Sequence, residues 1–168
     1  MSEEHRPEIE FEHDDFDFTT LEDELRVDEL YGKILRRFYL QLLEEEVTPE
    51  KATILANGAD YFVRDFIVGY MQRSLFDEMP GIVRRFAGNW YIVNTLDPAV
   101  AQLAGHLEGV RTFCRFLRSH DLISAEYLSE VEKESSDIDF YAGRIDSFWA
   151  IKGDGYFAWE RECTLKDS

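Results

Sequence analysis

The 168-residue chain has few of the residues that staple or anchor a protein. Its two cysteines, Cys114 and Cys163, stand at no recognisable spacing, which favours free thiols in a reducing cytoplasm over a disulfide framework. The N-terminus is acidic and carries no apolar stretch, so we expect no secretory signal. No uncharged apolar run approaches the ~18 residues of a membrane-spanning helix. Composition therefore predicts a cytoplasmic protein without a membrane segment.

Motifs of the familiar catalytic classes are missing as well. G-x-S-x-G, the phosphate-binding P-loop, H-E-x-x-H and C-x-x-C do not occur in the chain. Gly153-x-Gly155-x-x-Ala158 matches the dinucleotide fingerprint by letter, but only ten residues follow it. That is too short for the helix and strand that complete such a site, so we expect a turn. We predict no catalytic residue and no cofactor.

Acidic residues cluster at two places without the pattern of a metal site. Residues 10–15 offer carboxylates and one imidazole, but no rigid scaffold that would fix ligand geometry. Asp137-x-Asp139 begins like a calcium loop, yet Ala142 stands where the loop requires glycine and the downstream ligands are missing. We therefore predict no metal ligands.

Negative charge is abundant. The chain has 35 Asp and Glu against 18 Lys and Arg, a net charge of −17, and 13 of these acids lie in the first 30 residues. Ile9, Phe11, Phe16 and Phe18 are threaded through this acidic run. A purely solvating tail needs no aromatic rings. We expect residues 1–19, here called the arm, to lie on another surface of the same chain or of a partner through Phe11, Phe16 and Phe18.

The middle of the chain has the opposite character. Residues 61–118 hold seven Arg, no Lys and five acids. Arginine suits fixed, bidentate pairing with carboxylates. Because the whole chain carries −17, sequence-independent binding to nucleic acid is disfavoured. The chain is therefore dipolar, with an acidic arm and a mildly basic centre.

Helical signals dominate the remainder, and we predict an all-α fold: one bundle-like domain of about five to six helices over residues 20–168. Thr19 or Thr20 can cap a first helix that runs to about residue 46. Thr48 caps a second helix with Pro49 in its first turn, and the apolar face of this helix continues to about residue 71. Gly58 permits a break within it.

The next stretch is harder to assign. A short segment opens at Pro80 and can stop at Gly88. Residues 90–96 are uncharged and can form either a buried helical turn or an extended connector. Asp97-Pro98 repeats the cap-then-proline signature, so we expect a helix from there to about residue 119.

The C-terminal third carries two more helical patterns. Ser124 can cap a helix, which residues 132–136 interrupt before a last helix over residues 137–149. Residues 153–155 predict a turn. Residues 156–165 can form a short strand, as in a hairpin, an irregular segment or a helical turn.

The helix expected over residues 97–119 has two apolar sides. One broad face is formed by Leu103, Leu107, Val110, Phe113, Cys114 and Leu117. The second side is formed by Ala101, Gly105, Gly109 and Phe116, and its small residues let another backbone approach closely. Arg111, Arg115 and Arg118, here called the arginine edge, line up between the two sides.

Three interpretations of the arginine edge stay open. Its guanidinium groups can pair with local acids at a solvated surface. They can dock the acidic arm or an acidic partner. They can also contact phosphate.

Residues 97–124, DPAVAQLAGHLEGVRTFCRFLRSHDLIS, loosely resemble the helical core-binding domain of tyrosine recombinases and phage integrases. That family often shows a capped helix ending in a turn rich in Arg, Phe and Leu, followed by a short loop. The resemblance covers about 28 residues, and the family's catalytic H-x-x-R occurs nowhere in the chain. It implies a similar packing of helices.

Aromatic residues gather again near the C-terminus, at Trp149, Tyr156, Phe157 and Trp159. They can belong to the core, to a groove that receives the arm, or to the wall of a ligand pocket. His106 falls on the apolar side of its helix, which favours a hydrogen-bonded core histidine over a ligand. Cys114 sits on the apolar face of this helix, without a cation beside its thiol to lower the pKa, which favours an inert core residue.

The leading hypothesis is a non-catalytic helical protein that acts by protein–protein contact, with the arm as its contact element. The partner would be another protein or a second copy of the chain, and neither nucleic acid nor a membrane. One alternative is a nucleic-acid-associated accessory protein that uses the arginine edge. A further alternative, which includes enzymes, is a small-molecule-binding domain with an aromatic pocket.

Overall fold

A computed structural model describes residue 16 and residues 20–165, with side chains up to residue 163. Every regular element in this part of the chain is helical, which confirms the all-α prediction. Counted as continuous rods, these residues form seven helices, close to the five to six predicted. The elements are α1 (Leu21–Glu44), α2 (Pro49–Asp60), η2 (Tyr61–Tyr70), η3 (Leu75–Asp77), α3 (Ile82–Arg85), η4 (Phe86–Trp90), α4 (Tyr91–Asn94), α5 (Val100–Ser119), α6 (Ala125–Ser135), α7 (Ile138–Trp149) and α8 (Tyr156–Leu165).

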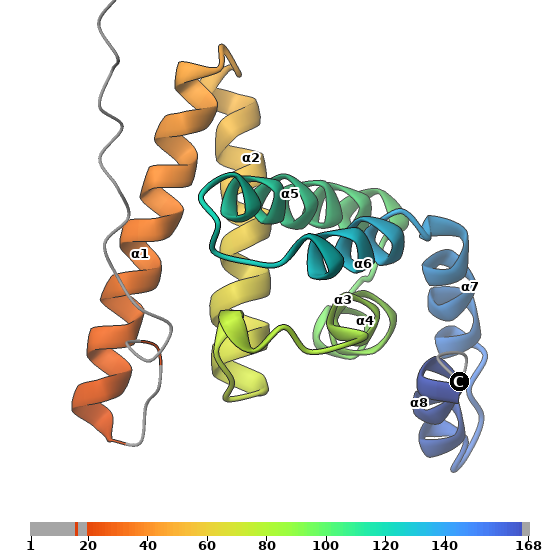
Figure 1. Cartoon of the computed structure of the whole chain (residues 1–168). Coiled ribbons are helices and arrows are strands. Elements are labelled where there is room, and N and C mark those ends of the chain that lie inside the picture. The colour runs from red at the N-terminus through yellow and green to blue at the C-terminus, as the bar shows by residue number, and fades with distance from the viewer. Residues whose placement is uncertain (1–15, 17–19, 166–168) are drawn as a thin grey trace, which may run out of the picture.

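The helices pack in crossing layers (Figure 1). α1 and α2 run antiparallel side by side, and α5 crosses α2. α6 packs on α5, while α3, η4 and α4 form one rod that contacts η2, α7 and α8. One cluster of buried apolar side chains extends through these layers from Phe16 to Trp159.

Three helices begin at the residues that the sequence predicted. Thr20 and Asp23 exchange hydrogen bonds in a capping box, with the Asp23 N–H donating to Thr20 Oγ1 at 3.1 Å. The hydroxyl groups of Thr48 and Ser124 each accept a bond from the backbone N–H three residues further on, at 3.3 and 3.1 Å. Pro49 occupies the first turn of α2. These caps satisfy N–H groups that a helix leaves unpaired at its start.

The glycines expected to interrupt helices do not do so. α2 continues through Gly58 into η2, and the rod formed by α3, η4 and α4 continues through Gly88. A Cβ on Gly58 would lie 3.1 Å from the backbone of His106, and one on Gly109 would lie 2.5 Å from the carbonyl oxygen of Leu55. Both glycines therefore mark the place where α2 and α5 touch, and helix packing outweighs the intrinsic cost of glycine.

The apolar face predicted for α5 is confirmed, because all six of its side chains are buried. The second side is confirmed only in part. Gly109 and Phe116 are buried, whereas a Cβ on Gly105 would meet nothing within 4 Å and Ala101 is exposed. The close approach is thus confined to a short stretch around Gly109.

α5 begins later than predicted, at Val100, and its N-cap is Ala99 in an extended conformation. The hydroxyl group of Tyr91 accepts a hydrogen bond from the Ala99 N–H at 3.1 Å and lies 3.2 Å from the Ala99 carbonyl oxygen. It also donates to Oε1 of Gln102 at 2.6 Å. The prediction of a start at Asp97-Pro98 was wrong because this tyrosine, on the preceding rod, supplies the cap.

The C-terminal segment is a helix, so of the alternatives left open for residues 156–165 the helical one is confirmed and the hairpin and the irregular segment are wrong. After the turn at residues 153–155, α8 runs along α7 and the η4 rod. Its inner face buries Trp159 and Cys163. Tertiary burial of these two side chains selects the helix that local pattern left open.

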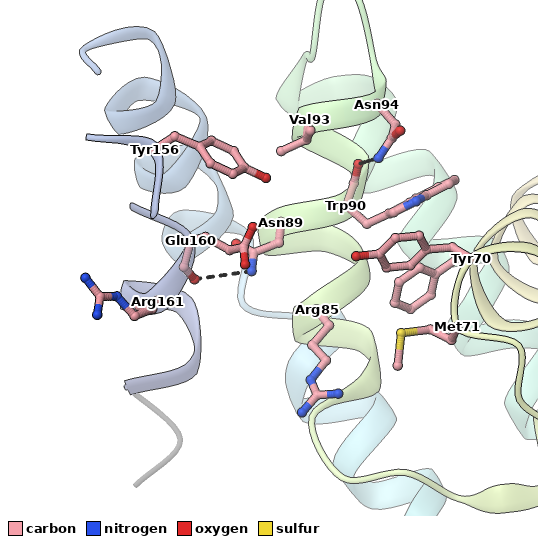
Figure 2. A pocket seen from close by; sticks show the side chains of 11 residues that line it. Tyr70, Met71, Arg85, Asn89, Trp90, Val93, Asn94, Tyr156, Glu160 and Arg161 are labelled. Atoms are coloured by element: carbon pink, nitrogen blue, oxygen red, sulfur yellow. Dashed lines mark hydrogen bonds between the residues drawn. The ribbon is translucent and has the colours of Figure 1, made fainter. Parts of the chain in front are cut away.

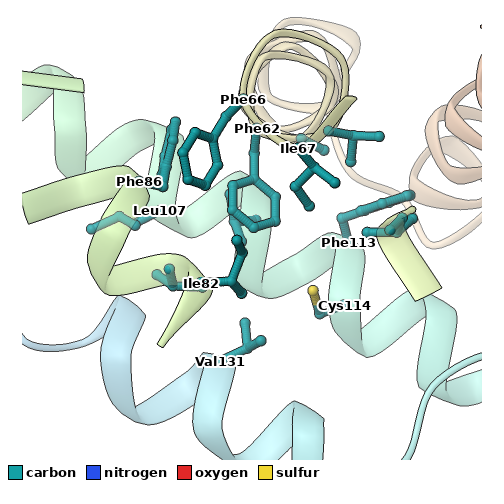
Figure 3. Packing of buried hydrophobic residues seen from close by; sticks show 14 of the residues in the cluster. Phe62, Phe66, Ile67, Ile82, Phe86, Leu107, Phe113, Cys114 and Val131 are labelled. Atoms are coloured by element: carbon teal, nitrogen blue, oxygen red, sulfur yellow. The ribbon is translucent and has the colours of Figure 1, made fainter. Parts of the chain in front are cut away.

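The centre of the core is aromatic (Figure 3). Phe62 packs edge-to-face on Phe86 with ring centroids 5.1 Å apart, and Phe66 lies 5.5 Å from the same ring. Cys114 is fully buried in the same cluster, and burial raises its thiol pKa to about 12, so it stays protonated at neutral pH. None of the described helices combines the length and the apolar character that crossing a membrane requires.

Candidate functional site: an arm anchor and an aromatic groove

Phe16 anchors the C-terminal end of the arm to the helical domain. Its ring is fully buried, with centroids 4.8 Å from Tyr31 and 4.7 Å from Phe76. The Tyr31 hydroxyl group accepts a hydrogen bond from the Leu75 N–H at 3.0 Å, which joins α1 to η3. Phe11 and Phe18, the other two predicted contact residues, lie outside the described residues.

The arginine edge is engaged with this chain. Arg115 pairs with Glu132 at 2.7 Å, and Arg118 pairs with Asp121 at 3.1 Å. Arg111 donates to the carbonyl and hydroxyl oxygens of Ser135, each at 3.5 Å. All these acceptors belong to α6 or to the loop before it, so the edge holds α6 against α5. Any partner of these arginines would have to compete with those contacts.

A groove of about 460 Å³ opens where the end of η2, the rod of η4 and α4, and α8 meet (Figure 2). We define it by its aromatic residues and by the charged residues at its rim: Phe66, Tyr70, Trp90, Tyr156, Arg85, Glu160 and Arg161. The three elements come from distant parts of the sequence. Of the C-terminal rings that the sequence pointed to, only Tyr156 lines this groove.

Aromatic rings form the floor of the groove. Phe66 and Tyr70 stack with centroids 6.0 Å apart, and Trp90 lies 5.5 Å from Phe66 and 6.3 Å from Tyr70. Tyr70 is 63% exposed and Val93 is 40% exposed, so part of this apolar surface is uncovered. Such a concave aromatic floor suits a flat apolar group.

The rim of the groove is rich in hydrogen-bond donors. Arg85 is exposed, and within the described residues its guanidinium has no hydrogen-bond or ion-pair partner. Burial, and then the Glu160 carboxylate, raise the pKa of Tyr156 to about 12, so its hydroxyl group stays protonated at neutral pH. Arg161 adds a second cation and donates to the Phe157 carbonyl oxygen at 3.4 Å. The rim favours a ligand that carries carboxylate or other acceptor groups.

A buried arginine fixes α8 as one wall of the groove. Arg144 is only 4% exposed, and its guanidinium lies 3.8 Å from the ring centroid of Trp159. It donates to the carbonyl oxygens of Gly88 and Trp159 at 3.0 and 2.5 Å, and to Oδ1 of Asn89. Burial lowers its pKa from the ordinary value, although arginine remains charged. The indole N–H of Trp159 donates a hydrogen bond to Ser147 Oγ, also on α7, at 3.0 Å.

Sequence reasoning did not find Arg144. One signal was available: Arg144 stands three residues after Tyr141 and one before Ile145, on the buried face of α7.

The C-terminal aromatic residues other than Tyr156 divide into buried and exposed ones. Trp159 belongs to the core, whereas Trp149 and Phe157 are 60% and 71% exposed and do not.

His106 and the acidic residues offer little for catalysis. The imidazole of His106 lies between the rings of Tyr61 and Tyr91, at 5.0 and 5.8 Å, and burial lowers its pKa, so it is neutral at pH 7. Glu134 is partly buried, which raises its pKa, and it accepts a hydrogen bond from the Arg84 N–H at 2.9 Å. In the described part of the chain no three His, Cys, Asp or Glu side chains come together as a metal site would require.

Comparison with known proteins returns no match among protein-family models, curated proteins or solved structures. The resemblance of residues 97–124 to the tyrosine recombinase core-binding domain therefore rests on sequence alone and stays a hypothesis. The function must be argued from the anchor, the arginine edge and the groove.

Proposed function

We propose that this chain is a helical protein that acts by protein–protein contact, with the arm as its contact element. The observation that carries this proposal is the complete burial of Phe16 between Tyr31 and Phe76. A segment attached at this point presents its preceding acids from one fixed place on the domain. Its carboxylates would select a basic partner and speed the encounter, and its rings would supply buried area.

The state of the arginine edge supports this choice over the nucleic-acid alternative. Contact with phosphate would require Arg115 to leave Glu132 and Arg118 to leave Asp121. It would also have to overcome the repulsion due to a net charge of −17. No observation on the described residues favours that alternative.

The groove favours a second candidate, the binding of a ligand. Its volume of about 460 Å³ lies within the usual range of ligand sites, roughly 300–1,000 Å³. Its polar groups, however, are largely occupied: Asn89 contacts Arg144 and the Glu160 carbonyl oxygen, and Asn94 donates to the Trp90 carbonyl oxygen. Among the described residues the free donor is Arg85, at the rim, so the groove suits a segment that lies across it better than a small molecule held by many polar contacts.

Affinity capture with matched variants tests the leading proposal. One variant replaces Glu8, Glu10, Glu12 and Asp14 with their amides, and the control does the same for four exposed acids on α6 and α7, Glu126, Glu130, Asp139 and Asp146. We expect a protein partner with a basic surface to be captured by the natural chain and by the control, and to be reduced at least tenfold with the arm variant.

The two variants have the same net charge, so a loss confined to the arm variant identifies the arm as the contact element. Equal capture by both variants would contradict the proposal. Equal loss with both would indicate that overall charge, and not the arm, attracts the partner.

A further inference from the structure

We propose that the groove receives the arm of the same chain, with Phe11 on the aromatic floor and its flanking carboxylates, Glu10 and Glu12, at the arginine rim. This inference rests on the proposed function of the arm and names the surface on which the arm lies when no partner holds it.

The floor of the groove is an uncovered aromatic surface that matches an aromatic side chain. Tyr70 is 63% exposed although its ring stacks on Phe66. The ring of Trp90 also contacts Tyr70, with centroids 6.3 Å apart. Aromatic rings favour other rings in tilted or offset contact. The arm offers such a ring at Phe11, which alternates with acids rather than with other apolar residues.

The rim supplies the complementary charge. Arg85 lacks a partner in the described part of the chain, although the chain has 35 acids for 18 bases. Its neighbour Arg84 makes the contrast clear, because it lies 4.0 Å from the Asp137 carboxylate and over the Phe140 ring. Glu160, the one acid among the described residues that line the groove, interacts with the Tyr156 hydroxyl group. A carboxylate beside a bound ring would therefore meet Arg85.

The arm can reach the groove from its anchor. The Phe16 ring lies 4.7 Å from Phe76, and Phe76 is five residues after Met71, which lines the groove. Because a residue spans at most ~3.6 Å, the five residues from Phe76 back to Met71 cover at most about 18 Å, and the five residues from Phe16 back to Phe11 can extend over the same length. A segment tethered this closely has a high effective concentration at the groove, which favours it over a free competitor.

Paramagnetic relaxation in the full chain tests this docking. A nitroxide is attached to Glu8→Cys, which is possible because the natural Cys114 and Cys163 are buried at 0% and 1% exposure. We expect the indole N–H signal of Trp90 to lose at least half its intensity relative to the reduced label, with no change on tenfold dilution. The probe thus reports contact within one molecule.

Matched charge reversals then locate the contact. Arg85→Glu should restore the Trp90 signal, whereas Arg36→Glu, at an exposed arginine on α1 away from the groove, should leave the loss of signal unchanged. Tyr70→Ala is a second groove variant. The side chains of Arg85 and Tyr70 are both exposed, so circular dichroism should show an intact fold for both groove variants.

Four outcomes would overturn the docking: no loss of Trp90 signal, recovery on dilution, equal recovery in both charge reversals, or a loss of signal that persists in Arg85→Glu and in Tyr70→Ala. If the Trp90 signal is unaffected but the arm variant still fails to capture its partner, the docking is wrong and the proposed function stands. If the signal is lost as expected but capture survives the arm variant, the docking stands and the proposed function is wrong.

Discussion

At the scale of single residues, the absence of a side chain matters as much as its presence. Gly58 and Gly109 bring α2 and α5 into backbone contact, and the Cβ that either lacks would meet the other helix. Arg144 works in the opposite way, because its long side chain fills the space between α7, η4 and α8 and saturates carbonyl groups there. Both kinds of residue position the elements that form the groove.

Two glycines on one helix should respond oppositely to the same change. Gly109→Ala places a Cβ 2.5 Å from the Leu55 carbonyl oxygen, so we expect a loss of about 1–3 kcal/mol in unfolding free energy. Gly105→Ala meets nothing within 4 Å and should be neutral or stabilising by about 0.5–1 kcal/mol. Urea unfolding of both variants measures the difference. Equal destabilisation would mean that the helix is rotated relative to α2.

At the scale of elements, the positions of the helices are fixed by two kinds of contact: contacts between residues close in the sequence and contacts between residues far apart in it. A capping hydroxyl group starts each of the helices α1, α2 and α6, and it accepts a hydrogen bond from the backbone N–H three residues further on. α5 begins at Ala99 because Tyr91, on the preceding rod, occupies the backbone groups there. α8 is held by Arg144 of α7, which donates to the Trp159 carbonyl oxygen and lies over the Trp159 ring.

Tyr91→Phe tests the start of α5. The change keeps the buried ring and removes the hydroxyl group that serves Ala99 and Gln102. Leaving the Ala99 N–H and the Gln102 amide without this partner should cost about 1–3 kcal/mol of unfolding free energy. Hydrogen exchange should also quicken in the first turn of α5. Tyr70→Phe, which changes a 63% exposed residue, is the control and should leave stability unchanged.

At the scale of the whole molecule, charge is distributed unevenly. The arm carries much of the net charge of −17, while the arginines of the middle segment are mostly paired within the helical domain. Arg85, at the groove, has no partner among the described residues and is the exception on which the docking proposal depends. The asymmetry favours contact between the arm and a basic surface over binding to a polyanion.

Electrophoretic mobility of DNA tests that balance. We expect duplex and single-stranded DNA to migrate unchanged at micromolar full-length protein in low salt, because repulsion by the whole molecule offsets a few arginines. A shift that weakens steeply with added salt would contradict this. If the triple change of Arg111, Arg115 and Arg118 to Glu abolished such a shift, the nucleic-acid alternative would replace the leading proposal.

The sequence by itself determined the helical class, the starts of three helices and the buried face of α5. These features depend on hydrogen bonds across three residues and on apolar spacing of 3.6 residues, both of which can be read locally. It also singled out Phe16, whose surroundings were not foreseeable because Tyr31 and Phe76 lie 15 and 60 residues away.

Only the tertiary structure decided where helices touch and what lies between them. The pairing of Arg144 with Gly88 spans 56 residues, and the groove takes Tyr70, Arg85 and Tyr156 from three separate elements. None of these residues forms a motif with its neighbours in sequence. Their association follows from burial of α5 against α2 and of α8 against α7, which depends on the free energy of the whole packed core and leaves no local pattern.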